Sequence, residues 1–288
     1  MQDVDITHVL VPLDGSELAL QAIPTARALA ERFGASLHTV TLAESKSQAI
    51  RARRLAAAAL DVPDEDERVF IATEGEPDEV IAQRAESLGS CLICLATHGR
   101  GRLGGALVGS VARSVLQRVQ GPVIVLGPQA DNPGWTPRPR RWPAPLSVQR
   151  IVACVDGTKA SEQVMPIAAA WAQRLAMELT IVTIVHDDPP PLALERTDRL
   201  YDGDDDATGY IDRLVETWRA SDVHVNGEVL RDPISPASAI RDYLTQRPAG
   251  LLALSTHARS GMQRVRLGAV AASIVHTSVV PCLVNPVR

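Results

Sequence analysis

The feature that most constrains this chain is an internal repeat. The segment HVLVPLDGSELALQAIPTARALAERFGASLHTVTL begins at His8, and the similar segment RIVACVDGTKASEQVMPIAAAWAQRLAMELTIVTIV begins at Arg150. Asp14 aligns with Asp156, and the two positions lie 142 residues apart. Because one pattern is used twice in 288 residues, the sequence predicts two copies of one domain.

The spacing between matching positions changes once along the chain. Gly109 aligns with Gly268 and Pro122 with Pro281, and both pairs lie 159 residues apart. The second copy therefore carries an insertion. We place it at the acidic, Pro-rich stretch near residues 187–209, whose composition is typical of a surface loop.

A second Pro-rich stretch, GPQADNPGWTPRPRRWPAPLS, lies between the copies and is typical of a linker. We therefore expect a first domain at residues 1–128, a linker at residues 129–147 and a second domain at residues 148–288.

Predicted strands and helices alternate in each copy. In the first copy, short apolar runs predict strands at residues 8–13, 36–42, 69–73, 91–96 and 123–126. Helical signals follow them after Ser16, near Gln48, at Pro77 and at Gly109. This alternation predicts an α/β fold, with a doubly wound, mostly parallel, Rossmann-like sheet in each domain. Aromatic residues make up only 3% of the chain, which fits the aliphatic core of such sheets.

Composition narrows the range of partners. The formal net charge of −5 argues against a nucleic acid or an anionic membrane as the partner. The N-terminal sequence MQDVDITHVLVPLD lacks the basic and apolar regions of a signal peptide, and no run of about 18 apolar residues is present. We expect a soluble, cytoplasmic protein that binds small molecules or proteins.

Cys91 and Cys94 have the CxxC spacing of redox and metal sites. They lie in an apolar run that predicts a strand, where residues three apart point to opposite faces. No cluster of histidines and carboxylates shows metal-ligand spacing either. We therefore predict no protein-bound metal.

Ligands of open parallel sheets bind beyond the carboxyl ends of the strands. In the first copy, Asp14 follows the first strand, Leu42 ends the second, and a Gly-rich and Arg-rich loop follows the fourth and leads to Gly109 and Ser110. Glycines let backbone N–H groups approach an anion, and a helix start adds unpaired amides and a positive dipole end. The pattern predicts a phosphate site. The alternatives are a flexible loop with Ser110 as a simple helix cap, and Asp14 as a turn-forming residue.

Two common nucleotide motifs do not apply. Gly99-Arg-Gly-Arg-Leu-Gly104 has the form GxGxxG, but it follows the fourth strand, and no acidic residue stands about 20 positions later. We therefore reject binding of NAD or FAD by that motif. The P-loop motif GxxxxGK[ST] is absent from the sequence.

The fourth-strand segment resembles the ATP-binding signature of universal stress proteins, Gly-x2-Gly-x9-Gly-Ser/Thr. Here the order is Ala96-Thr-His-Gly99, nine residues, then Gly109-Ser110, with Ala96 in place of the first glycine. The resemblance extends to VPLDGS, GEPDEVI and PVIVLGP, and it recurs in the second copy.

This resemblance implies that the first copy binds ATP, with or without Mg²⁺. Asp14 would contact the adenosine and Leu42 would lie near the adenine. Gly99, Gly109 and Ser110 would hold the phosphates. The full set of expected binding residues is Pro12, Leu13, Asp14, Gly15, Leu42, Ala96, Thr97, His98, Gly99, Arg100, Gly101, Arg102, Gly109, Ser110 and Val111.

The second copy departs further from the signature. Its order is Ser255-Thr-His-Ala258, nine residues, then Gly268-Ala269, so the second glycine and the terminal hydroxyl are both lost. The added Cβ and the lost hydrogen bond predict an affinity for ATP that is lower by about two to three orders of magnitude. A different anion and an empty site remain alternatives for this copy.

In the family, single domains pair through their last strands. The resemblance therefore implies an intrachain pseudo-dimer through residues 123–126 and 282–284, and a homodimer of the whole chain is a further alternative.

The resemblance also implies a stress-response module that binds an adenine nucleotide and signals to a protein partner of unknown identity. The rivals are a slow ATP hydrolase and a nucleotide-free scaffold. We assign no catalytic residue, because paired metal-binding carboxylates and an activated nucleophile are absent from the pattern.

Overall fold

The computed structural model describes residues 5–97, 108–130, 148–185, 204–219, 223–231, 235–256 and 267–286. The elements of the first half are β1 His8–Pro12, α1 Glu17–Leu20, α2 Ala22–Phe33, β2 Ser36–Leu42, α3 Lys46–Leu60, β3 Val69–Ala72, α4 Pro77–Leu88, β4 Cys91–Ala96, α5 Ser110–Arg118 and β5 Val123–Leu126. Those of the second half are β6 Arg150–Cys154, α6 Lys159–Glu162, α7 Met165–Arg174, β7 Glu178–Val185, α8 Asp204–Arg219, β8 Val225–Arg231, α9 Pro236–Gln246, β9 Leu251–Ser255, α10 Ala269–Thr277 and β10 Cys282–Asn285.

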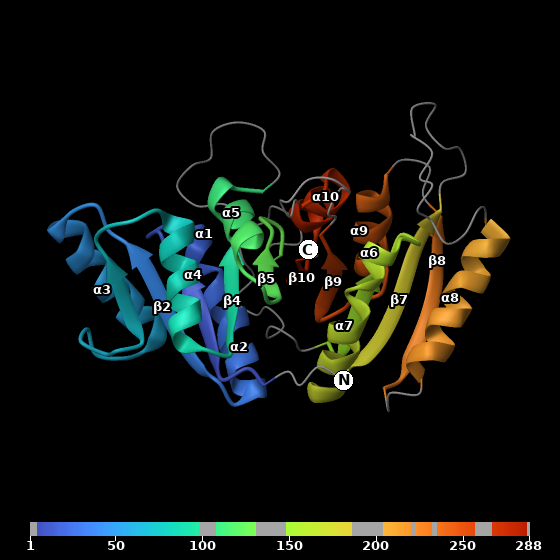
Figure 1. The fold of residues 1–288 in the computed structure, drawn as a ribbon, viewed down its shortest axis with the longest axis horizontal. Coiled ribbons are helices and arrows are strands. Elements are labelled where there is room, and N and C mark those ends of the chain that lie inside the picture. Colours follow the sequence, from blue (N-terminus) through green and yellow to red (C-terminus); the bar gives the residue numbers. More distant parts are fainter. Residues whose placement is uncertain are drawn as a thin grey trace.

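The described strands form one ten-stranded sheet in the order β3-β2-β1-β4-β5-β10-β9-β6-β7-β8. Within each half, neighbouring strands pair in parallel. Helices cover both sides of the sheet, as Figure 1 shows. The prediction of two tandem α/β domains with mostly parallel sheets is confirmed.

The helix expected after Ser16 is divided into two pieces, α1 and α2. The Ser16 hydroxyl accepts a hydrogen bond from the Ala19 N–H at 3.1 Å, which caps α1. The break has a local cause: Pro24 has no N–H to donate to the carbonyl of Leu20, the last residue of α1. Pro166 stands in the same relation to the end of α6, so the second half has the same break.

Two helix boundaries differ from the sequence prediction. Helix α3 begins at Lys46 rather than near Gln48, because the Ser45 hydroxyl caps it by accepting from the Gln48 N–H. The insertion expected as a loop near residues 187–209 is helical from Asp204 onwards, so that part of the prediction is wrong. Acidic residues favour a helix start, and Tyr210 and Ile211 bury one side of α8 against the sheet. Residues 186–203 lie outside the described part.

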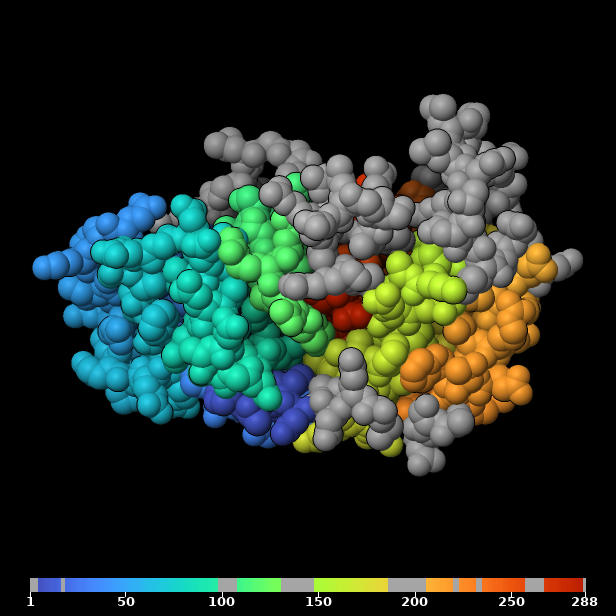
Figure 2. Space-filling view, in the orientation of Figure 1, coloured from blue at the N-terminus to red at the C-terminus, as the bar shows by residue number. Residues whose placement is uncertain are grey.

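The two halves join through their last strands. Strand β10 runs antiparallel to β5, with Leu283 opposite Ile124 and Cys282 opposite Val125. Since the strands within each half are parallel to one another, the two sets of carboxyl ends leave this junction in opposite directions. Figure 2 shows the C-terminal residues, in red, between the green and yellow-green atoms of the two halves.

Alternate residues of each strand point to opposite faces and build two apolar layers. One layer lies between the sheet and α2, α3, α7 and α8, and the other lies under α4, α5, α9 and α10. Each layer continues across the junction from one half to the other. In Figure 1, α5 and α10 lie at the top of the view and α2 and α7 at the bottom.

A pair of matching contacts ties α2 to α7 across the junction. The Arg32 guanidinium donates to the Leu175 carbonyl oxygen at 3.3 Å, and Arg174 donates to the Phe33 carbonyl oxygen at 3.2 Å. Arg32 and Arg174 occupy equivalent positions of the repeat, as do Phe33 and Leu175. The two hydrogen bonds therefore join equivalent positions of the two halves.

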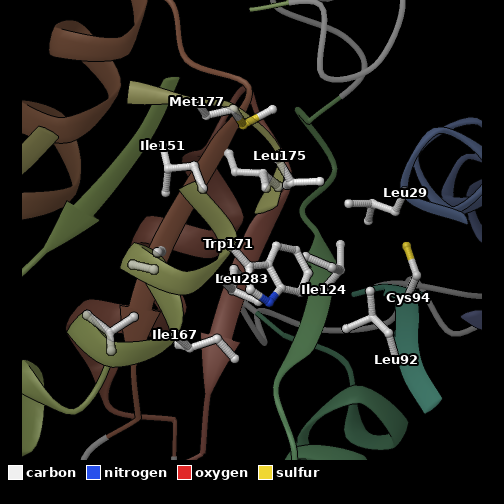
Figure 3. Packing of buried hydrophobic residues seen from close by; sticks show 14 of the residues in the cluster. Leu29, Leu92, Cys94, Ile124, Ile151, Ile167, Trp171, Leu175, Met177 and Leu283 are labelled. Atoms are coloured by element: carbon white, nitrogen blue, oxygen red, sulfur yellow. The ribbon is translucent and has the colours of Figure 1, made fainter. Parts of the chain in front are cut away.

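Trp171 lies at the centre of this junction and is fully buried. Its ring meets Phe33 edge-on, with the ring centroids 5.0 Å apart. In Figure 3 the indole of Trp171, on α7, lies beside Ile124 and Leu283 of the paired strands. One side chain thus contacts both halves.

The two cysteines with CxxC spacing lie on β4 and face different layers. Cys94 belongs to the layer under α2, whereas Cys91 packs against the layer under α4. Both are free thiols. Their orientation agrees with the prediction that they share no site. Among the described helices, none is long and apolar enough to cross a membrane.

We expect Trp171→Ala to lower the free energy of unfolding by about 3–5 kcal/mol, because it leaves a cavity between the halves. Urea denaturation measures this change. Ile50→Ala is the control, since Ile50 is 56% exposed and its loss should change stability by less than about 0.5 kcal/mol. Equal losses in the two variants would show that Trp171 does not hold the halves together.

Burial of His38 makes stability depend on pH. Its two ring nitrogens are buried without a hydrogen-bond partner among the described residues. Burial lowers the pKa of His38 from 6.5 to about 4, helped by the nearby His8, Arg84 and Arg68 and opposed by Asp66. The unfolded chain therefore binds one more proton than the folded chain between these two values.

We expect the free energy of unfolding to fall as the pH is lowered from about 6.5 to about 4. His38→Leu should flatten this dependence. Urea midpoints measured across this pH range test the prediction, and equal slopes in the wild type and His38→Leu would contradict it. The carboxyl of Asp66 acts in a lower window, because its hydrogen bonds with Arg68 lower its pKa from 3.8 to about 2.

Candidate functional site

A cavity of about 730 Å³ lies at the carboxyl ends of β1, β2 and β4. Residues of α3 form one wall, and residues of α4 and the start of α5 form others. This is the place where open parallel sheets bind their ligands. Its volume is within the usual range for small-molecule sites, about 300–1,000 Å³.

Ten of the fifteen residues expected from the sequence line this cavity. They are Pro12, Leu13, Asp14, Gly15, Leu42, Ala96, Thr97, Gly109, Ser110 and Val111. The other five, His98, Gly99, Arg100, Gly101 and Arg102, lie outside the described residues. The structure thus brings together segments that are almost 100 residues apart in the sequence.

The end of β1 presents a half-buried carboxylate to the cavity. An Asp14 carboxylate oxygen accepts a hydrogen bond from the Ser16 N–H at 2.9 Å, and Gly15 between them has a left-handed φ of +79°. The turn-forming role considered for Asp14 is therefore real. It is compatible with ligand binding, because a carboxylate has two oxygens and about four lone-pair positions.

The start of α5 presents backbone amides to the same cavity. The Gly109 N–H donates to the Thr97 carbonyl oxygen at 2.7 Å, which ties the helix start to the end of β4. The first helical bond runs from the Arg113 N–H to the Gly109 carbonyl oxygen. The amides of Ser110 and the next two residues therefore have no acceptor within the helix. Gly109 is the N-cap, so the alternative in which Ser110 caps the helix is wrong.

Sequence reasoning missed the wall formed by α3. Gln48, Arg51, Ala52 and Leu55 line the cavity and have the spacing of one helix face. The Gln48 side chain accepts a hydrogen bond from the Glu44 N–H at 2.8 Å, which fixes the start of the helix. The helical period was visible in the sequence, but nothing there indicated that this face turns toward the ends of β1 and β4.

Other cavity residues extend the expected segments at their edges. They include Val40, Thr41, Ala43 and Glu44 around the end of β2, and Pro77, Val80 and Ile81 on α4. Most of these side chains are aliphatic. The cavity therefore has an apolar region near β2 and α4, and polar groups at Asp14 and at the start of α5.

The corresponding aspartate of the second half lies in a similar turn, with an added hydrogen bond from a side chain. An Asp156 carboxylate oxygen accepts from the Thr158 hydroxyl at 2.7 Å and from the Thr158 N–H at 3.2 Å. The same hydroxyl accepts from the Ser161 N–H at 3.1 Å and is buried. Asp156 is thus held by a side-chain network within its own turn.

The helix start also differs between the halves. Gly268 caps α10 as Gly109 caps α5, but the first helical residue is Ala269 in place of Ser110. Ser255 replaces Ala96, and its buried hydroxyl has no hydrogen-bond partner among the described residues. Ala258 lies outside the described part. The second half therefore lacks the helix-start hydroxyl, and its aspartate accepts in addition from the Thr158 hydroxyl.

The profile of the Universal stress protein family matches the chain twice, at residues 5–127 and 147–286. The universal stress proteins Rv1996 and Rv2005c of Mycobacterium tuberculosis are each 28% identical, over 200 and 197 residues. Each match covers 67% of this chain, and 58% and 61% of the two relatives. The chain thus spans less than two thirds of the length of these relatives.

Solved structures share the fold across the whole chain. A universal stress protein from Archaeoglobus fulgidus has a TM-score of 0.68 at 15% identity, with 99% of both chains covered. A protein from Pseudomonas aeruginosa described as a putative universal stress protein has a TM-score of 0.54 at 17% identity, covering 98% of this chain and 93% of its own.

Proposed function

The chain belongs to the universal stress protein family, and we propose that its N-terminal half binds ATP and acts as a nucleotide-dependent module in a stress response. The observation that carries the proposal is the composition of the cavity in that half. Helix amides for phosphate stand at one end, a carboxylate for the ribose follows, and an aliphatic region for the base lies beyond it.

The phosphates would bind at the start of α5. Ser110, Val111 and Ala112 line the cavity, and their three consecutive amides have no intrahelical acceptor. The positive end of the helix dipole and the Ser110 hydroxyl add to the attraction for an anion. This wall suits a phosphate group of any nucleotide.

The nucleoside would bind between Asp14 and the aliphatic region. A carboxylate is a strong acceptor for the ribose hydroxyls. Val40, Leu42 and Val80 offer the apolar surface that a purine base covers. Any Mg²⁺ that accompanies ATP would be held mainly by phosphate oxygens, since the described residues contain no group of three or more metal-binding side chains.

The proposal is asymmetric. The second half would bind ATP weakly or not at all, because its helix start lacks a hydroxyl and Ala258 stands in place of Gly99. In this proposal the protein works in the cytoplasm, and a protein partner recognises its ATP-bound form. Whole-chain homodimers would form through surfaces other than the β5–β10 junction, which both halves already occupy.

Gly109→Val should abolish ATP binding, because a branched side chain at the N-cap fills the space through which phosphate approaches the amides. Gly268→Val, at the equivalent position of the second half, should change little. Equilibrium dialysis of the full chain with ATP measures both, and unfolding curves check that each variant is folded. Equal loss of ATP binding in the two variants would contradict the asymmetry.

The fate of the nucleotide in the same dialysis with the wild-type chain separates the three candidate functions. Intact ATP after hours of incubation supports a binding module, ADP would indicate a hydrolase, and no retention of ATP would leave only a scaffold.

Asp14→Asn should weaken binding of ATP and adenosine about tenfold, since a charge-assisted bond to the ribose becomes a neutral one. Asparagine can still accept from the Ser16 N–H, so the turn after β1 is kept. Asp156→Asn is the matched control and should leave ATP affinity unchanged. Isothermal titration calorimetry measures the three affinities, and an effect of Asp156→Asn as large as that of Asp14→Asn would refute the assignment.

A further inference from the structure

We propose that Arg51 of α3 is a base-binding residue that lays its guanidinium plane against the base of the bound nucleotide. The inference rests on the proposed nucleotide site and assigns a role that the family signature does not include. It comes from the one wall of the cavity that the sequence motifs do not reach.

Helix α3 carries three arginines in one turn, and they have different surroundings. Arg53 donates to the carbonyl oxygens of Asp64 and Val69 at 3.1 and 3.4 Å. Arg54 forms an ion pair with the Asp64 carboxylate at 3.7 Å. Arg51 lines the cavity and makes no hydrogen bond or ion pair with any other described residue. Two of the three arginines thus attach the helix to the following loop, and the third faces the site.

The position of α3 places Arg51 at the end of the cavity away from the phosphate site. Helix α3 packs on β2 and β3, whereas α5 starts after β4, and β1 lies between β2 and β4. Neighbouring strands are about 4.8 Å apart, so the two ends are separated by roughly 10–14 Å. Figure 1 shows α3 at the outer end of the first half and α5 near the middle of the molecule. A nucleotide with its phosphates at α5 therefore extends its base toward Arg51.

The chemistry of the cavity leaves a place for a planar cation. None of the described residues that line it is aromatic, and the apolar side chains near α3 are aliphatic, Leu42 and Leu55 among them. A purine has two flat π faces, and aliphatic side chains pack on them without the electrostatic attraction that a cation adds. A guanidinium group is planar, weakly hydrated and stacks on aromatic faces, whereas the lysine ammonium is a compact, strongly hydrated charge. Arg51 can therefore complete a sandwich around the base.

The test compares Arg51→Lys, which keeps the charge and loses the plane, with Arg51→Gln, which loses the charge as well. Titration calorimetry on the full chain measures binding of adenosine, ATP and inorganic tripolyphosphate. We expect both variants to bind adenosine and ATP about two- to fivefold more weakly, with tripolyphosphate binding unchanged. Arg54→Gln, on the same helix but paired with Asp64, is the control and should alter none of the three affinities.

Four results would overturn the inference. Wild-type affinity for adenosine in Arg51→Lys would mean that only charge matters, and a parallel loss of tripolyphosphate binding would place Arg51 at the phosphates. Unchanged affinities in both variants would remove Arg51 from the site while leaving the proposed function intact. Failure of the wild type to bind ATP would instead reject the proposed function, and the role of Arg51 with it.

Discussion

The antiparallel pairing of β5 with β10 is the contact on which the rest of the molecule depends. It turns two five-stranded sheets into one and lets each apolar layer run without interruption from half to half. It also brings α2 beside α7, where Trp171 is sealed from solvent and the two equivalent arginines exchange hydrogen bonds with backbone carbonyls. Gly127, directly after β5, lies so close to the Val275 carbonyl oxygen that a Cβ would collide with it. The pairing covers the β5 edge of one sheet and the β10 edge of the other, which would otherwise be open.

The same pairing separates the two potential sites. Because β5 and β10 run in opposite directions, the strand ends that form the cavity of the first half lie away from the equivalent strand ends of the second. The halves can therefore diverge in binding while keeping the junction. The structure shows such divergence at the helix starts, where Ala269 stands in place of Ser110. Asp14 and Asp156 keep the same turn, although Asp156 also accepts from the Thr158 hydroxyl. One half can therefore lose its ability to bind a ligand without any change in the packing at the β5–β10 junction.

Much of the fold could be predicted because its signals are local. In the sequence, apolar runs located the strands, Gly34 located the end of α2, and Pro77 located the start of α4. In the structure Gly34 has the left-handed φ of +70° that favours glycine at a helix end. The errors have local causes too. Pro24 interrupts a helix that periodicity alone joins, Ser45 starts α3 early, and the acidic stretch at Asp204 begins a helix instead of continuing a loop. Each reflects competition between two local preferences that only the packed structure resolves.

The sequence by itself determined the repeat, the order of the elements and the residues that follow each strand, because these depend on neighbours in the chain and on the two-residue and 3.6-residue periods. That was enough to name ten residues of one cavity. Only the tertiary structure decided that α3 turns Arg51 toward that cavity and that Trp171 lies between the halves. Those facts depend on side-chain directions and on contacts between segments far apart in sequence, which no local pattern encodes.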